Sequence, residues 1–132
     1  MSNYVYDRRR FNRSNQISCK VKVANNLDDL FSVKMVNISA GGLSFGLVGS
    51  PKYQVDDKLY LELFVHFHMA EISLIVEGIV IRHSNNIYAI KFLNLESHVQ
   101  NELDRIINLS IEHGIKEMIL FEPSKTFFRD EL

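Results

Sequence analysis

Apolar and polar residues alternate in short segments between residues 16 and 92. In the segment 17–23 the odd positions are apolar and the even positions are Ser or Lys, which is typical of a strand with one buried face. The pattern returns at 31–35, and it is clearest at 59–69, where every odd position is apolar. Residues 43–47, 72–82 and 87–92 are also rich in β-forming residues. These short strands with short connections predict a mostly β fold, a six-stranded antiparallel β-barrel.

Turn-forming residues separate these segments. Asn25 to Asp29 divides the first two, and the second strand is expected to end at Asn37. Gly78 is expected to mark a bulge or bend, because glycine inside a strand pattern often does so. Ser84-Asn85-Asn86 has the composition of a hairpin turn. Most neighbouring strands are therefore expected to pair directly.

The hydrophobic period changes at Ser97. Ser97 and Gln100 fit a capping box, and apolar residues then recur at helical spacing as far as Gly114. One C-terminal amphipathic helix is expected to cover the barrel. A second short helix is predicted over 115–121, ended by Pro123. The predicted organisation is a flexible N-terminal arm (1–15), a barrel with its helix (16–114), and a short helix and tail (115–132).

Composition limits the classes of protein that fit. The chain has 132 residues, of which 46% are hydrophobic and 23% charged, which is typical of one globular domain. The absence of a long apolar run predicts no membrane insertion, and the lack of an apolar N-terminal stretch predicts a cytoplasmic protein. The net charge of −1 argues against binding to duplex DNA. Cys19 is the single cysteine, so no internal disulfide can form, and we expect it in the core.

The first residues are locally very basic. Arg8, Arg9, Arg10 and Arg13 lie within six residues and are opposed only by Asp7. All four are arginine, whose planar guanidinium forks its donors and stacks on flat rings, whereas lysine presents a point charge. Alone, such an arm is typical of a solvated basic tail that attracts any polyanion.

Two motifs together resemble a known family. Arg9-Arg10-Phe11-Asn12-Arg13 matches the RxxxR element of PilZ domains, and Asn37-Ile38-Ser39-Ala40-Gly41-Gly42 matches their (D/N)xSxxG element. Each motif alone is weak, but their order and their separation by about one hairpin are more specific. The resemblance covers roughly residues 7 to 113 and implies a six-stranded barrel with a helix. It also implies a receptor for cyclic di-GMP that is not an enzyme and acts on a downstream effector protein.

The resemblance assigns roles to individual residues. Arg9 and Arg13, with Arg8 and Arg10 beside them, would contact guanine edges and phosphates, since arginine suits both targets. Asn37 would face a guanine and Ser39 would add a hydroxyl on the same side of the strand. Gly41 and Gly42 would allow positive φ and close approach. The family often has aspartate where Asn37 stands, and losing that charge weakens the contact by ~1 kcal/mol.

Other functions remain open. The chain could be a PilZ-like protein-interaction module without nucleotide binding, or a barrel that binds single-stranded nucleic acid through its arginines. The second alternative needs aromatic residues on one exposed face, yet Phe31, Phe45 and Phe67 fall mostly on the expected core face. His66 and His68 share a face of the 59–69 strand, but two histidines without a third ligand make a weak metal site. No catalytic motif is present, so no cofactor or enzyme activity is expected.

Overall fold

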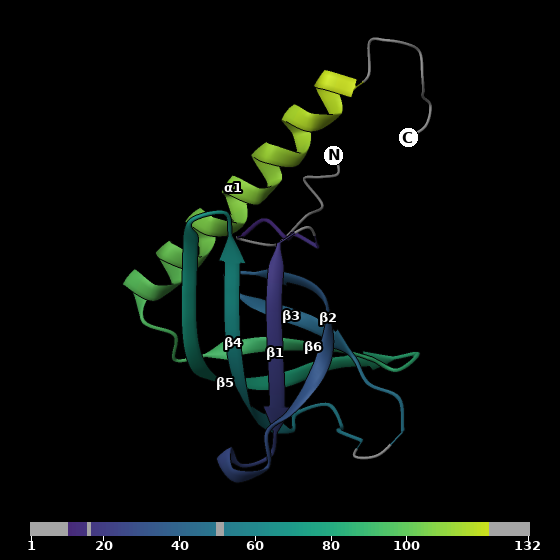
Figure 1. Ribbon diagram of the computed structural model, residues 1–132. Helices are drawn as coiled ribbons and strands as arrows, with labels where there is room; N and C mark the ends of the chain where they lie inside the picture. Colours follow the sequence, from purple (N-terminus) through teal and green to yellow (C-terminus); the bar gives the residue numbers. More distant parts are fainter. Residues whose placement is uncertain (1–10, 16, 50–51, 122–132) are drawn as a thin grey trace.

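The computed structural model describes residues 11–15, 17–49 and 52–121, with 115–121 described through the backbone only. Six strands and two helices follow one another (Figure 1). In chain order the elements are β1 (Ser18–Ala24), the 3₁₀ helix η1 (Leu27–Asp29), β2 (Phe31–Ser39), β3 (Gly42–Gly46), β4 (Lys58–Phe67), β5 (Ala70–Ser84), β6 (Ile87–Leu93) and α1 (Ser97–Phe121).

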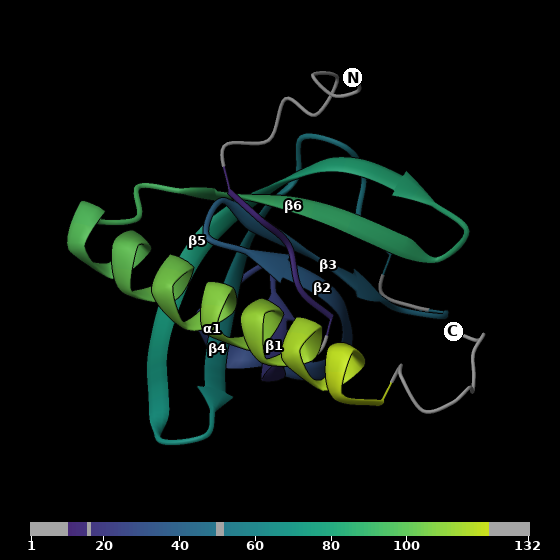
Figure 2. The same cartoon turned by 90° about the horizontal axis from the view of Figure 1, so that it is seen from above.

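The six strands form a closed barrel. Their order around the wall is β1-β2-β3-β6-β5-β4, and each neighbouring pair is antiparallel. Closure pairs β1 with β4, so the barrel has no free sheet edge over that stretch. The helix α1 lies across one end of the barrel (Figure 2). The predicted fold class is confirmed.

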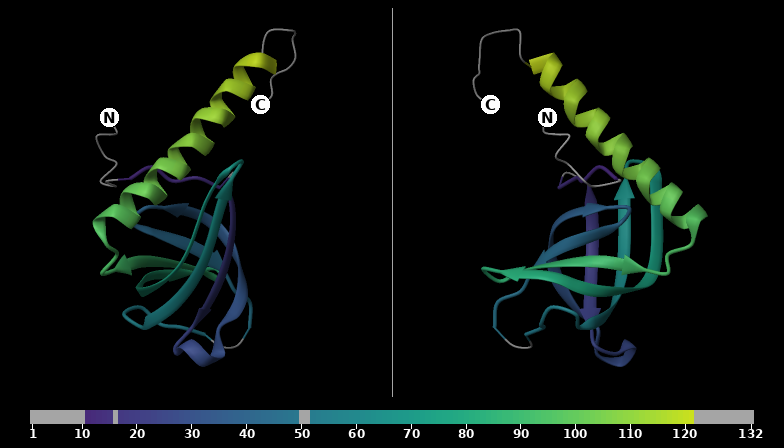
Figure 3. Two further views of the ribbon diagram at one scale, coloured as in Figure 1. Left: turned by 60° about the vertical axis from the view of Figure 1, so that its left-hand side comes forward. Right: turned by 180° about the vertical axis from the view of Figure 1, so that it is seen from behind.

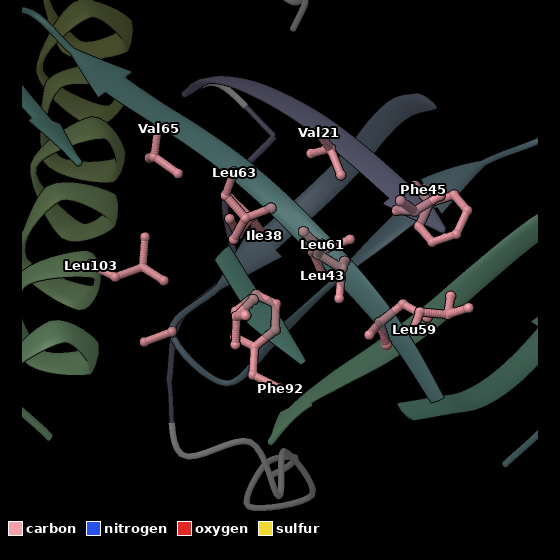
Figure 4. Close-up of a cluster of buried hydrophobic side chains, with 14 of the residues drawn as sticks. Val21, Ile38, Leu43, Phe45, Leu59, Leu61, Leu63, Val65, Phe92 and Leu103 are labelled. Carbon is pink, nitrogen blue, oxygen red and sulfur yellow. The ribbon is translucent and has the colours of Figure 1, made fainter. Parts of the chain in front are cut away.

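The alternating pattern is explained by the barrel interior. The odd positions of β4, from Leu59 to Val65, are fully buried, whereas the even positions face outward. Helix α1 closes the interior from above with Leu103, Ile106 and Ile107, each fully buried, and Figure 4 shows Leu103 beside the strand residues of this cluster. Burying each such side chain stabilises the fold by roughly 1.5–3 kcal/mol.

The β4 strand is shorter than its pattern predicts. It ends at Phe67, and His68 follows with a φ of 55° in the turn that leads into β5. Met69 is 97% exposed at this turn, so the prediction that it continues the buried face is wrong. His68 likewise does not share a strand face with His66. A tight turn requires left-handed backbone here, and alternation alone does not reveal where a strand reverses.

The hairpin turn predicted at Ser84-Asn85-Asn86 is confirmed, and it connects β5 to β6. Asn85 and Asn86 have φ values of 53° and 65°, which two-residue hairpin turns of type I′ require and which asparagine tolerates. Gly78 does not mark a bulge, since it pairs regularly with Leu59 and Phe92. A Cβ at position 78 would lie 2.5 Å from Cγ2 of Ile90, so glycine is needed there for packing.

The helix α1 is one continuous helix from Ser97 to Phe121. The predicted break at Gly114 is absent, because one glycine in a helix costs only about 1 kcal/mol and no proline follows at once. Residues 115–121 therefore extend α1 instead of forming a second helix, and α1 continues past the barrel (Figure 3). The tail from 122 to 132 lies outside the described residues. Within the described part of the chain, no helix has the length and apolarity needed to cross a membrane.

Candidate functional site

A cavity of about 490 Å³ lies on the outer wall of the barrel, beside the arm. This volume is within the range of about 300–1,000 Å³ that is usual for small-molecule sites. Its lining includes two residues of the arginine motif, Phe11 and Arg13, and four of the second motif, Asn37, Ser39, Gly41 and Gly42. The structure therefore brings together two segments that are far apart in the sequence.

The floor of the cavity follows from the strand register. Asn37 pairs with Ser44, Ser44 with Ala89, and Ala89 with Arg82, so one row of residues crosses β2, β3, β6 and β5. Adjacent strands lie about 4.8 Å apart, so Asn37 and Arg82 are roughly 14 Å apart along the sheet. The two residues between them are small, which leaves a shallow floor between two polar walls.

A bulge in β2 turns Asn37 and Ser39 toward this cavity. Phe31, Val33 and Met35 face the core, and regular alternation would turn Asn37 inward as well. The register with β3 instead shifts between Met35 and Asn37, which makes Val36 the extra residue. Ile38 then becomes the buried residue, and Asn37 and Ser39 face outward. β2 continues to Ser39, so the predicted strand end at Asn37 is two residues early.

A second bulge places Arg82. The register between β5 and β6 shifts between Val80 and Arg82, so Ile81 is the extra residue there. Arg82 is thereby paired with Ala89 on the outward face that also carries Lys91. Bulges often re-aim side chains beside binding sites. Both bulges of this barrel border the same cavity.

The sequence interpretation missed two cations of the site. Arg82 and Lys91 line the cavity together with Arg13, and the lining residues include no carboxylate. Lys91 could have been identified from the sequence, because it is the one charged residue within 87–92. In the structure it pairs with Gly42 of the second motif. Arg82 could not have been identified, because the bulge at Ile81 decides which face of β5 its side chain lies on. The three cations suit an anionic ligand.

Gly42 has a different role from the one predicted. A Cβ at this position would lie 2.1 Å from the carbonyl oxygen of Ile90 in β6, so glycine lets two strands approach. The left-handed backbone expected there is not found, since Gly49 is the glycine with positive φ among the described residues. A Cβ on Gly41 would lie 3.4 Å from Cδ2 of Phe11, an ordinary contact with the arm.

Ser39 shapes the end of its own motif. Its Oγ accepts a hydrogen bond from the N–H of Gly41 at 3.2 Å and lies 3.3 Å from the Gly42 carbonyl oxygen, to which it donates. The hydroxyl thus fixes the turn after β2, as serine often does. The N–H of Phe92 binds the Gly41 carbonyl at 2.9 Å, which ties this turn to β6.

The described part of the arm is attached to the barrel at Ser14. This residue exchanges two backbone hydrogen bonds of 2.9 Å with Ile38, and it is 6% exposed. Phe11 packs against the core, and Arg13 lines the cavity. Arg8, Arg9 and Arg10 lie outside the described residues. Their place in the site stays a prediction.

The N–H of Gln100 donates to the carbonyl oxygen of Glu96 at 2.9 Å instead of to Ser97, as the predicted capping box requires. The side chain of Gln100 makes a contact outside α1. Nε2 donates to the carbonyl oxygen of Ala40 at 3.1 Å, 60 positions away in the chain. Gln100 therefore connects the first turn of α1 to the second motif. A local capping pattern could not reveal this contact, because the partner is brought in by the fold.

The other candidate ligand groups do not form sites. His68 stacks edge-on against Phe67 and His113, at ring distances of 4.4 and 4.9 Å. Across the part of the chain that is described, no three His, Cys, Asp or Glu residues gather as metal ligands. Asp57 accepts from the N–H of Gln54 at 2.8 Å and so closes its turn.

The fold and the cavity define a class of protein: a small β-barrel domain whose outer wall carries a cavity lined with cations. The sequence matches the PilZ domain over residues 7–109. The chain belongs to the PilZ domain family. The comparison with curated proteins found no match.

Solved structures support the same fold. The inhibitor of motility MotI/DgrA of Bacillus subtilis is similar with a TM-score of 0.68 and 17% identity, covering 83% of this chain and 53% of that one. The PilZ domain of YcgR from Escherichia coli with c-di-GMP has a TM-score of 0.58 and 17% identity, over 85% of this chain and 98% of that one. The chain thus spans about half the length of MotI/DgrA.

Proposed function

We propose that this protein is a receptor for cyclic di-GMP that binds the nucleotide in the cavity between the arm and β2. The observation that carries the proposal is the meeting of Arg13, from the first motif, with Asn37 and Ser39 on one cavity wall, opposite Arg82. The family typically binds this ligand. Two solved relatives, the PilZ domain and a longer chain of YcgR, are complexes with c-di-GMP.

The chemistry of the lining fits the ligand. Cyclic di-GMP carries two phosphodiester anions and two guanines, whose O6 and N7 atoms accept hydrogen bonds. Arg13, Arg82 and Lys91 supply donors and positive charge, and Asn37 offers both an acceptor and donors to a guanine. Arg8, Arg9 and Arg10 complete the cationic set in the proposal.

The competing nucleic-acid function has less support. Binding of single strands uses exposed aromatic residues as stacking platforms. Phe45, Tyr53 and Tyr88 are instead buried in the core, where Phe45 stacks on Tyr88 with ring centroids 5.4 Å apart. Among the described residues, the aromatic side chains that line the cavity are those of Phe11, which is partly buried, and Phe92, which is buried.

The output is proposed to be a change of surface. Closure of the basic arm over the bound nucleotide neutralises its phosphates and presents a different face to a downstream effector protein. Part of the binding free energy is used to order the arm. The effector would recognise the closed arm and the adjacent barrel wall.

Calorimetric titration with cyclic di-GMP tests the proposal. Wild-type protein should bind, and Arg13→Ala should bind about 10- to 100-fold more weakly, because hydrogen bonds to charged groups are worth about 1.5–3 kcal/mol. Arg105→Ala is the matched control, since Arg105 lies on α1 and pairs with Glu102 at 2.6 Å. Arg9→Ala should behave like Arg13→Ala.

Two outcomes would contradict the proposal. Wild-type binding no tighter than that of Arg13→Ala would show that the cavity does not hold the nucleotide. Equal affinity for cyclic di-GMP and for an oligonucleotide of single-stranded RNA, with a steep loss of both on adding salt, would instead indicate the nucleic-acid function.

A further inference from the structure

Helix α1 is hydrogen-bonded to both halves of the proposed site. Gln100 donates to Ala40 of the second motif at 3.1 Å, as described above. Further along the helix, Asn12 of the arginine motif donates from Nδ2 to Oδ1 of Asn108 at 3.0 Å. Figure 2 shows the described part of the arm running beside α1. One helix thus contacts both of the segments that border the cavity.

The contacts lie on a polar stripe of α1. Gln100, Asp104 and Asn108 are spaced by four residues, so their side chains lie one above the other on the helix surface. The neighbouring stripe, with Leu103 and Ile107, is fully buried in the core. The polar stripe is therefore held at a fixed position against the barrel, and it faces the arm and the second motif.

Asp104 orients Asn108. The amide nitrogen of Asn108 donates to Oδ2 of Asp104 at 3.3 Å. A carboxylate only accepts hydrogen bonds, so the amide nitrogen of Asn108 must face it and the amide oxygen must face Asn12. Oδ1 of Asp104 is buried and has no partner among the described residues. A buried oxygen without a partner lowers stability, so Asp104 is a candidate for a role other than stabilising the fold.

A second contact anchors the same part of the arm. The Oγ atoms of Ser14 and Ser110 are 3.0 Å apart and buried. Oγ of Ser110 also donates to the carbonyl of Ile107 at 2.7 Å, so the hydrogen between the two serines belongs to Ser14. Residues 12 and 14 are thereby fixed on α1, and Arg13 between them is directed into the cavity.

We propose that Asp104 and Asn108 are positioning residues for ligand binding, and that through them the occupied site and helix α1 stabilise each other. The inference rests on the proposed function. Neither residue lines the cavity, so neither is expected to touch the nucleotide. Coupling of this kind is reciprocal: if α1 holds Arg13 in the binding position, then a bound nucleotide must also stabilise that stretch of α1.

Asn108→Ala and its matched control Asn101→Ala test the proposal. Asn101 lies on the same helix and is exposed. Asn108→Ala should bind cyclic di-GMP about three- to tenfold more weakly than wild type, which corresponds to one lost hydrogen bond, whereas Asn101→Ala should bind like wild type. Asp104→Asn should give an intermediate loss, because an amide at 104 no longer fixes the orientation of Asn108.

A double-mutant cycle separates positioning from a general loss of stability. Asn12→Ala breaks the same hydrogen bond from the arm, outside the core. The double variant Asn12→Ala/Asn108→Ala should then bind no more weakly than either single variant. Amide hydrogen exchange supplies the second readout: cyclic di-GMP should slow exchange in the helix turn 104–108 of the wild type but not of Asn108→Ala.

The outcomes distinguish the two proposals. No binding by the wild type overturns the proposed function and the coupling with it. Binding by the wild type that is equalled by a folded Asn108→Ala, or additive losses in the cycle, overturns the coupling alone. Slower exchange in α1 of both proteins on adding ligand would likewise show that the helix responds by another route.

Discussion

The two halves of the proposed site are held in different ways. The half on β2 and β3 is part of the barrel wall, with strand pairing on both sides of β3 and a hydroxyl that fixes its turn. The described part of the arm joins the wall through the bridge between Ser14 and Ile38 and through Phe11, which lies beside Gly41. Two of its side chains, Asn12 and Ser14, also hydrogen-bond to α1. One half is built by the sheet, and the other by side chains of a helix.

Because of this difference, we expect the wall half to set the shape of the site and the arm half to change when a ligand binds. The wall half cannot change shape without breaking strand pairs, so in the proposed complex it fixes the position of the guanine. The arm half depends on a few hydrogen bonds, each worth about 0.5–1.5 kcal/mol, which a ligand of ordinary affinity can outweigh. We therefore expect substitutions that disturb the packing of the wall backbone to change folding, and substitutions of side chains beside the arm or in the cavity to change binding.

The largest expected effect is on the rate at which the thiol of Cys19, on β1, is chemically modified. This rate tests whether the barrel wall stays closed around β1. Burial raises the pKa of its thiol from 9.0 to about 12, so the thiolate that reacts is scarce in the folded protein. Between pH 7 and 9, iodoacetamide should modify native protein roughly a thousandfold more slowly than the chain in denaturant, by the ratio of thiolate fractions. Equal rates would mean that β1 separates readily from the wall.

The same pKa shift has a consequence for stability. The folded state holds the thiol proton more tightly than the unfolded state does, so the contribution of Cys19 is complete below pH 9. It is lost as the pH rises toward 12. Cys19→Ser should reduce this alkaline dependence, as measured by urea unfolding at several pH values.

Gly42→Ala should lower the free energy of unfolding by about 3 kcal/mol or prevent folding. Its Cβ would lie 2.1 Å from a backbone oxygen of β6, and neither strand can yield without losing pairs. The control is Gly41→Ala, which adds only a 3.4 Å contact to Phe11 and should stay within about 0.5 kcal/mol of wild type. Denaturant unfolding of both variants decides whether the wall is as rigid as inferred.

Arg82→Ala should weaken cyclic di-GMP binding by about 10- to 100-fold while leaving stability nearly unchanged. The side chain lines the cavity at the exposed end of β5, where its removal disturbs no packing. Calorimetric titration and thermal unfolding measure the two quantities on one sample. Unchanged affinity would remove Arg82 from the proposed site and place the ligand nearer to the arm.

Asn37→Asp should tighten binding by about fivefold, the smallest effect in this series. A charged acceptor bonds the guanine N–H donors more strongly than an amide does, by roughly 1 kcal/mol. Asn101→Asp adds the same charge at an exposed position of α1 outside the cavity lining and should change affinity much less. Weaker binding by Asn37→Asp would indicate that Asn37 faces a phosphate instead of a guanine.

Much of the barrel could be predicted because alternation and turn residues act locally. The odd positions of β4 and the asparagines of the β5–β6 turn were identified correctly, since their signals lie within a few residues. The bulges at Val36 and Ile81 were not, because a bulge is defined by the partner strand. Gly78 carried the local signal of a bulge but serves packing against Ile90.

About half of the candidate site could be predicted, again because only local signals can be recognised in the sequence. Arg13, Asn37 and Ser39 belong to motifs that can be read along the chain, and they do line one cavity. Arg82 and Lys91 come from strands that carry no motif. The contact between Gln100 and Ala40 spans 60 positions, and no local pattern encodes it.

The amino-acid sequence by itself determined the family, the strand content and the chemistry that its two motifs offer, because composition, period and motif order are properties of the chain. The tertiary structure alone decided which face Asn37 and Arg82 present and which helix residues hold the arm. A shift of one residue in strand register reverses the face of every side chain beyond it. That register is set by pairing between strands that are far apart in the sequence.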